Sequence, residues 1–305
     1  MPRWLRITLI VIVLLLVAGS GGYYWYIGDG DPPANLPAFA LDMATVRAKA
    51  DELPGGKASD VRVETVTSFT FPAVASVAGD GWDAKPMAAF SYQLILPTDT
   101  IVIDSALNAT QGASLGAKID DDAYARMDMA LAAATQIVVT HEHPDHIGGI
   151  LAYSDPAALG KALRLNQEQL ASLPKFGLAW PEALKDYVPI DYDTMLAIAP
   201  GVVLIRAPGH SPGSQMIFVK REDGRELLFV GDIGWTLRNV ETGKGRPRLL
   251  SQFMLNEDRE AVFAELATLK ALHAAAPNLL IVPGHDVAAI DALVASGAMA
   301  AGFRP

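Results

Sequence analysis

Residues 141–146 constrain the fold of this chain more than any other segment. They read His-Glu-His-Pro-Asp-His, which places three imidazoles and a metal-ligand carboxylate close together. In extended backbone, side chains two residues apart point to the same side, so His141 and His143 can bind one ion together. We expect Pro144 to turn the chain and to offer Asp145 and the last histidine to a second ion. Imidazole and carboxylate ligands without thiolate suit zinc, iron or manganese, so the segment predicts a metal centre.

Three further polar residues are expected at the ends of strands. His210, Asp232 and His285 each come shortly after a run of β-branched and other apolar residues. Such runs are typical of buried strands, and the loops that follow them can deliver polar side chains to one place. A set of unrelated turns with satisfied polar groups is the alternative, and the motif at 141–146 disfavours it.

The order of these residues, His-x-His-x-Asp-His followed by His, Asp and His, resembles the metallo-β-lactamase-fold hydrolase superfamily. The resemblance runs from about residue 61 to the end of the chain. It implies an α/β fold, the αββα sandwich, in which two packed sheets are covered by helices on both outer faces. It also implies a first metal site of His141, His143 and His210, a second site of Asp145, His146 and His285, and a bridging Asp232.

The resemblance implies roles for the remaining residues of the site. Asp104 resembles the buried strand-end carboxylate that orients a metal-bound imidazole in this superfamily, with an ordinary turn residue as the alternative. Two divalent ions, with zinc expected and iron or manganese as alternatives, would share a bridging hydroxide that attacks the substrate. Asp145 and Asp232 are the predicted catalytic residues. His273 has helical spacing to several leucines and is predicted to be structural.

The predicted reaction is hydrolysis of a lactone or a carboxylic ester. The β-lactamases of this fold use a cysteine ligand or lack the bridging aspartate, whereas this chain has no cysteine and has Asp232. N-acyl homoserine lactonases are similar in size and ligand set, although Trp235 stands where they have a tyrosine. Phosphoester hydrolysis is one alternative. A mononuclear-iron dioxygenase acting on a thiol persulfide and a non-catalytic binding module are two others.

The N-terminus predicts export. Residues 7–27 carry no charge, and about 20 apolar residues are needed to cross a bilayer. Two arginines precede this segment and two aspartates follow it, an order that places the rest of the chain outside the cytoplasm. We therefore expect residues 1–6 in the cytoplasm and residues 7–27 as an anchor in the cell membrane. A cleaved signal peptide, which would release a periplasmic or secreted protein, is the alternative.

The rest of the chain divides into a linker at 28–38 and a catalytic domain at 39–305. The net charge of −10 argues against a nucleic-acid partner, so a small-molecule substrate is expected and the oligomeric state stays open. Helices are predicted at 43–53, 122–134, most of 155–173, 256–275 and 287–296, with Asp42 capping the first and Asn256 the fourth. Strands are predicted at 61–70, 90–103 (a hairpin), 136–140 and repeatedly within 187–229.

The segment 235–254 is predicted to form a loop over the metal face. It is long for a connection, and long loops in compact domains commonly bind ligands. Trp235 and Phe253 would offer apolar contact to a substrate, while Arg246 and Arg248 would bind a carboxylate or phosphate. A solvated loop without such a role is the alternative.

Overall fold

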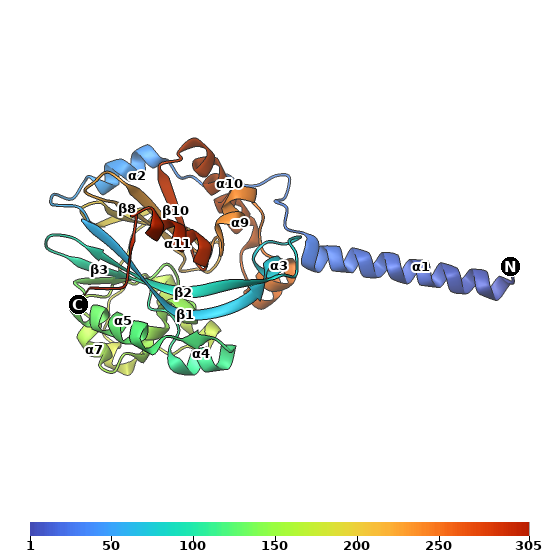
Figure 1. Cartoon of the computed structure of the whole chain (residues 1–305), viewed down its shortest axis with the longest axis horizontal. Coiled ribbons are helices and arrows are strands. Elements are labelled where there is room, and N and C mark those ends of the chain that lie inside the picture. Colours follow the sequence, from blue (N-terminus) through green and yellow to red (C-terminus); the bar gives the residue numbers. More distant parts are fainter. Residues whose placement is uncertain (305) are drawn as a thin grey trace.

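Two mixed β-sheets form the centre of the protein, whose computed structural model describes residues 1–304 (Figure 1). In the first sheet the order is β11-β1-β2-β3-β5, and β4 also pairs with β1. In the second sheet the order is β10-β9-β8-β7-β6. The strands of the first sheet are β1 (Asp60–Pro72), β2 (Ala84–Ile95), β3 (Thr100–Ile103), β4 (Lys118–Ile119), β5 (Gln136–Val138) and β11 (Ala300–Ala301). Those of the second are β6 (Met195–Ala199), β7 (Val202–Arg206), β8 (Gln215–Lys220), β9 (Glu226–Gly231) and β10 (Leu279–Pro283).

Three clusters of buried apolar side chains define the layers. One lies between the sheets and joins residues such as Phe90 and Phe229. A second packs the outer face of the second sheet against α2 (Met43–Ala50) and α10 (Arg259–Ala275). A third packs the outer face of the first sheet against helices that include α5 (Asp121–Ala133) and α6 (Pro144–Ala152). The helices therefore cover both outer faces, as Figure 1 shows, while α11 (Val287–Ala295) packs against the cluster between the sheets.

Strand direction brings the polar residues of interest to one edge of the molecule. In the first sheet β3 and β5 are parallel. In the second, β7 and β9 are both antiparallel to β8, and β10 is parallel to β9. The loops after β3, β5, β7, β9 and β10 contain Asp104, His141, His210, Asp232 and His285, respectively.

Most predicted elements are present, with different ends. The predicted hairpin within 90–103 is β2–β3, closed by a bond from the Leu96 N–H to the carbonyl of Asp99. Asp42 caps α2 by accepting from the N–H groups of Ala44 and Thr45, but the helix ends at Ala50. Regular strands in the region 187–229 begin only at β6.

Two predictions about local structure are wrong. Asn256 does not cap α10; its φ of 56° lies in the left-handed region, and Asp258 caps the helix by accepting from the N–H of Ala261. The segment 235–254 is not a simple loop, because it contains α9 (Leu237–Thr242) and a π-helical turn, Leu249–Met254.

Several short helices were not predicted. They are α3 (Ala73–Ser76), α4 (Ala109–Leu115) and α6, which starts at the proline that was expected only to turn the chain. The region 155–173 holds α7 (Pro156–Leu159) and α8 (Gln167–Ser172), and the 3-10 turns Leu173–Phe176 and Glu182–Leu184 follow. The helix predicted over most of 155–173 is therefore divided into two short helices.

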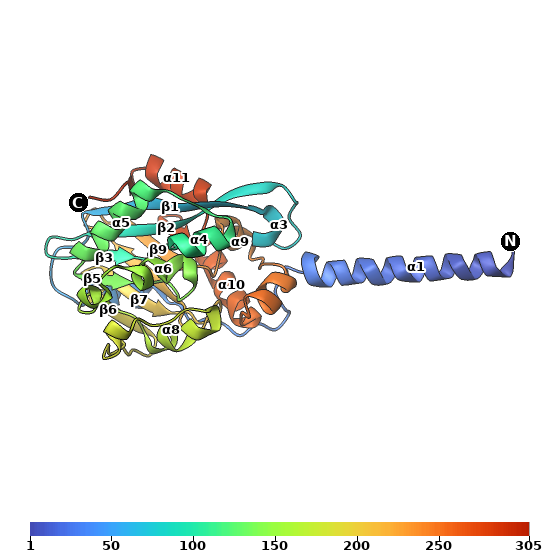
Figure 2. The same ribbon diagram turned by 90° about the horizontal axis from the view of Figure 1, so that it is seen from below.

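A helix of 21 residues, α1 (Arg3–Tyr23), projects from the body and continues into a π-helical turn, Tyr24–Gly28 (Figures 1 and 2). The combined segment is long and apolar enough to cross a membrane, and a signal sequence has the same properties. After it, the chain packs onto the body at Gly30, whose carbonyl accepts from the N–H of Gly245 at 3.0 Å.

Candidate metal centre

The seven predicted ligand residues lie together in two groups. Within each group, one candidate ligand atom from every residue lies within 4.8 Å of the others. Six of the seven side chains are buried, and the carboxylate of Asp145 is about one quarter exposed, at 24%. The first group is His141, His143, His210 and Asp232, and the second is Asp145, His146 and His285.

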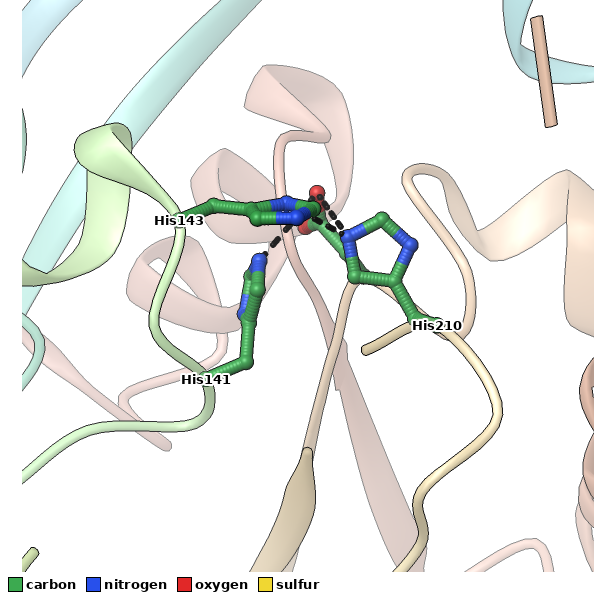
Figure 3. A group of neighbouring side chains, drawn as sticks. His141, His143 and His210 are labelled. Atoms are coloured by element: carbon green, nitrogen blue, oxygen red, sulfur yellow. Dashed lines mark hydrogen bonds and ion pairs between the residues drawn. The ribbon is translucent and has the colours of Figure 1, made fainter. Parts of the chain in front are cut away.

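The three histidines of the first group converge from two loops. His141 and His143 come from the loop after β5, and His210 comes from the loop between β7 and β8 (Figure 3). The ring centre of His141 lies 4.7 Å from that of His143 and 4.7 Å from that of His210. The ring centres of His143 and His210 are 4.5 Å apart. Nδ1 of His143 faces Nε2 of His210 at 2.9 Å.

Asp232 lies between the two groups. Its Oδ2 is 3.5 Å from Nε2 of His210 and 3.8 Å from Nε2 of His141. Its Oδ1 is 3.1 Å from Nε2 of His285 and 3.4 Å from Nε2 of His146. Its Oδ2 is also 3.2 Å from Nε2 of His285, so the carboxylate lies between the two groups and contacts both, as a bridging ligand requires.

Hydrogen bonds fix the orientation of the second group's imidazoles. Nδ1 of His146 lies 2.9 Å from Oδ2 of Asp104, and Nδ1 of His285 lies 2.8 Å from the carbonyl oxygen of Ala88. Asp104 also accepts from the N–H of Thr140 at 2.6 Å, which ties it to the ligand loop. In both histidines the Nε2 atom is left to face the centre, the arrangement that partners of metal-bound imidazoles produce.

A buried ion-pair network supports the first group. Oε1 of Glu257 lies 2.6 Å from Nδ1 of His210 and accepts from Nε of Arg246 at 2.9 Å. Nη2 of Arg246 donates to the backbone carbonyl of Asp232 at 2.7 Å. Burial alone would raise the pKa of Glu257, but the charges of Arg246 and His210 outweigh it and lower the pKa. The prediction that Arg246 meets substrate is therefore wrong, since its guanidinium is buried and paired.

Other residues of the predicted substrate loop are also engaged elsewhere. Arg248 pairs with Asp29 at 2.5 Å, and its guanidinium lies 4.7 Å from the ring centre of Trp25. The ring of Phe253 lies 6.1 Å from that of Trp25. Both residues thus contact the segment after α1 and not the metal face, which corrects the prediction. Trp235 does reach the site.

Trp235 is buried beside the shared carboxylate. Its Nε1 donates to Oδ2 of Asp232 at 2.7 Å, and its ring centre lies 5.8 Å from that of His285. The ring centre of Phe71, on β1, lies 6.0 Å from that of Trp235. Trp235 therefore holds the shared carboxylate and closes the second group on one side.

Sequence reasoning missed three supporting residues. Glu257 gave no signal beyond an acidic residue near a helix start. Phe176, whose ring centre lies 4.2 Å from that of His143, comes from a 3-10 turn with no motif. Glu142 lies inside the ligand motif, yet its carboxylate turns away to accept from Oγ of Ser211 at 2.9 Å. Burial raises the pKa of Glu142.

The pKa shifts of His141, His143 and Asp232, in the first ligand group, suit metal ligands. Burial lowers the pKa of His141 and His143 well below the usual value, so both favour the neutral form that ligates metals. Burial alone would raise the pKa of Asp232. The charges of His285 and His146 outweigh burial and hold this pKa well below its usual range. Nε2 of His141 and of His146 and Oδ1 of Asp232 are buried without a hydrogen-bond partner in the described part of the chain. Buried polar atoms are rarely left unpaired, and this nitrogen and oxygen set suits divalent ions.

A profile of the metallo-beta-lactamase superfamily matches residues 85–285, which is more than half of the chain. The chain therefore belongs to this superfamily. His273, the remaining histidine, lies on α10 and belongs to neither ligand group.

The curated relatives of the chain are N-acyl homoserine lactonases. The enzyme of Bacillus thuringiensis is 30% identical over 112 residues, which cover 34% of this chain and 40% of the relative. The enzyme of Bacillus cereus is 29% identical over 105 residues, with 34% and 40% covered. The chain thus spans about two fifths of the length of the curated relatives it matches.

Solved structures share the fold over a longer stretch. A quorum-quenching N-acyl homoserine lactone lactonase superposes with a TM-score of 0.61 at 17% identity, covering 77% of this chain and 95% of that chain. An N-acyl homoserine lactone hydrolase with N-hexanoyl-L-homoserine at its catalytic metal centre gives a TM-score of 0.60 at 16% identity, covering 77% and 96%. A dizinc quorum-quenching lactonase gives 0.51 at 15% identity, covering 77% and 90%.

Proposed function

We propose that this chain is a dinuclear zinc hydrolase that opens a lactone or cleaves a carboxylic ester. The observation that carries the proposal is the position of Asp232, whose carboxylate lies between two groups of imidazoles and contacts both. The relatedness to N-acyl homoserine lactonases supports lactones as the substrate class. N-acyl homoserine lactones are therefore the first substrates to test.

The chain's own residues define the parts of the reaction. Divalent ions bound at such a pair of groups would acidify a water molecule and polarise a carbonyl oxygen. Asp145 carries the most exposed carboxylate of the centre, with Oδ2 3.4 Å from Nε2 of His285. We assign to Asp145 the transfer of one proton: it accepts the proton that the attacking water releases and gives it to the alkoxide oxygen that leaves when the acyl C–O bond breaks. Trp235 has only an N–H donor and cannot pass a proton as a phenol can, so it positions Asp232.

The positions of the arginines disfavour phosphoester hydrolysis. A phosphate substrate needs cationic donors that are free to bind its oxygens. Arg246 is buried against Glu257, and Arg248 is paired with Asp29. An uncharged lactone or ester makes no such demand.

We also propose that residues 7–27 stay in place as an anchor in the cell membrane, with residues 39–305 outside the cytoplasm. The exposure of every apolar side chain of α1 supports this placement, because a soluble protein would gain by burying them. A signal peptide removed after export is the alternative.

Metal counting and a substrate panel test the enzymatic proposal. The purified full-length chain should contain two zinc ions per molecule by elemental analysis, and chelation should lower its melting temperature. The zinc-loaded chain should hydrolyse acyl lactones faster than phosphodiesters. A single iron per chain with thiol-dependent oxygen uptake would favour the dioxygenase alternative and contradict the proposal.

A further inference from the structure

Exposed apolar side chains gather where α1 joins the body. Phe253 and Met254 of the π-helical turn are 56% and 70% exposed, and Leu249 of the same turn is 42% exposed. At the end of the β1–β2 hairpin, Trp82 is 63% exposed and Phe71 is 42% exposed. We call these five residues the base surface. Grouped apolar side chains of this kind mark a site of interaction.

The base surface is fixed to the end of α1 by direct contacts. The ring of Phe253 lies 5.8 Å from that of Tyr26, and Nε1 of Trp82 donates to the hydroxyl of Tyr23 at 3.2 Å. Figures 1 and 2 show α1 leaving the body beside α3, which lies in the same hairpin. A bilayer crossed by α1 would therefore end at the level of these residues.

We propose that the base surface lies on the phospholipid bilayer that α1 crosses. In this position the metal centre receives a substrate dissolved in the lipid, an amphiphilic acyl lactone or ester. Tyrosine and tryptophan favour the membrane interface, and the other apolar side chains gain by entering the acyl region. The substrate part of this inference rests on the proposed function, while the docking part rests on α1 as an anchor.

A row of aromatic side chains links the base surface to the metal centre. The ring of Phe71 lies 5.7 Å from that of Phe69 and 6.0 Å from that of Trp235. The ring of Phe69 lies 5.4 Å from that of His285 in the second ligand group. An acyl chain that lies along these rings stays in apolar contact from the lipid to the site.

Ion pairs neutralise several of the charges at the junction. Asp29 pairs with Arg248, and Arg238 pairs with Asp80. Lys244 pairs with Asp31 at 3.2 Å. The exposed apolar side chains are the contacts that favour docking, so we expect it in neutral phosphatidylcholine bilayers without anionic lipid.

Site-specific labels test the docking part in the full-length chain. The sequence has no cysteine, so Met254→Cys and Trp82→Cys each provide one labelling position. Val188→Cys is the control: it is 81% exposed and follows the turn Glu182–Leu184, which packs against α7 at the end of the body remote from α1 (Figure 1). Each labelled protein is reconstituted in phosphatidylcholine vesicles and exposed to a nitroxide lipid or to aqueous iodide.

The two quenchers separate the outcomes. Labels at 254 and 82 should be quenched by the nitroxide lipid and shielded from iodide, while the label at 188 should show the reverse. Equal iodide quenching at all three positions would overturn docking. Shielding from both quenchers at 254 and 82 would indicate a protein partner there and would also overturn it.

Kinetics test the substrate part. Leu249→Ser and Met254→Ser should lower the ratio of kcat/KM for a long-acyl lactone in vesicles to that for a short, water-soluble lactone. The expected fall is about threefold to tenfold, because apolar contact with lipid is lost. An unchanged ratio would overturn delivery from the lipid. If the wild-type chain hydrolyses no lactone or ester, the proposed function fails, whereas the labels still decide docking.

Discussion

At the scale of single residues, the centre depends on a few carboxylates in different surroundings. Asp232 serves both ligand groups, Asp104 orients His146, and Glu257 joins His210 to Arg246. Among the carboxylates named here, only that of Asp145 is partly exposed to solvent, at 24%. Burial and neighbouring groups thus give these carboxylates different surroundings, and the proton transfer proposed for Asp145 depends on its exposure.

Replacing the shared carboxylate should uncouple the two groups. We expect Asp232→Asn to lose at least about one hundredfold in kcat/KM and one of two zinc ions, because one ligand serves both sites. Elemental analysis and steady-state kinetics provide the measurement. Asp291→Asn, at an exposed position on α11, is the matched control and should keep both ions. Full activity of the Asp232→Asn protein would contradict a dinuclear centre.

Removing the charge of Glu257 should destabilise the protein and weaken the first site. Glu257→Gln leaves the buried guanidinium of Arg246 without its counter-charge, and breaking a buried pair costs about 3–5 kcal/mol. Zinc affinity should also fall by about ten- to a hundredfold, since His210 loses its partner. Chemical denaturation and zinc titration measure the two effects. The exposed Glu260→Gln should change neither, and equal behaviour of both variants would refute this role.

At the scale of helices and strands, the sequence predicted the elements that depend on the residues within one segment. Alternating and apolar runs predicted β1, the β2–β3 hairpin and β5, and the close ligand motif predicted His141 and His143. Residues whose role depends on distant partners were not predictable. Arg246 is paired with a glutamate that the sequence does not mark, and Phe253 packs on residues that precede the domain.

The start of α10 shows how close alternatives are decided. Both Asn256 and Asp258 suit an N-cap, but only Asp258 has extended backbone and accepts from the N–H of Ala261, at 3.0 Å. Asp258→Ala should therefore lower the free energy of unfolding by about 1 kcal/mol. Asn256→Gly should cost nothing or stabilise, because glycine tolerates positive φ. Denaturation curves of the two variants measure these effects. A larger loss of stability in Asn256→Gly than in Asp258→Ala would indicate that Asn256 is the cap.

A buried carboxyl on α10 should make stability depend on pH. Burial raises the pKa of Glu265 from 4.5 to about 8, although the N–H of Gly209 opposes the shift. Between these values the folded state holds a proton that the unfolded state has released, so stability should fall as pH rises. The slope for this group approaches ~1.4 kcal/mol per pH unit. Glu265→Gln cannot ionise, and its stability curve between pH 5 and about 8 should be flatter. Parallel curves of stability against pH for the wild type and Glu265→Gln would contradict the raised pKa of Glu265.

At the scale of the whole molecule, α1 projects from the body that contains the candidate metal centre. The helix is apolar and unburied, and the aromatic residues at its end contact the body. These contacts alone do not distinguish an anchor from a signal peptide, because cleavage near residue 20 would leave Tyr23 to Tyr26 on the mature protein. The first residue of the mature protein makes the distinction.

The anchor should hold the full chain in the membrane. About 20 apolar residues suffice to span a bilayer, and Arg3 and Arg6 favour a cytoplasmic N-terminus. We expect the protein to resist extraction with alkaline carbonate, to keep Met1 or Pro2 as its first residue, and to expose its C-terminus to protease outside the cytoplasm. Arg3→Glu with Arg6→Glu should reduce the fraction with this orientation, whereas Lys270→Glu, at an exposed position on α10, serves as a control for charge change alone. A mature protein that begins near Gly21 and appears in the soluble fraction would show that the helix is a signal peptide, and export would then stand without the anchor.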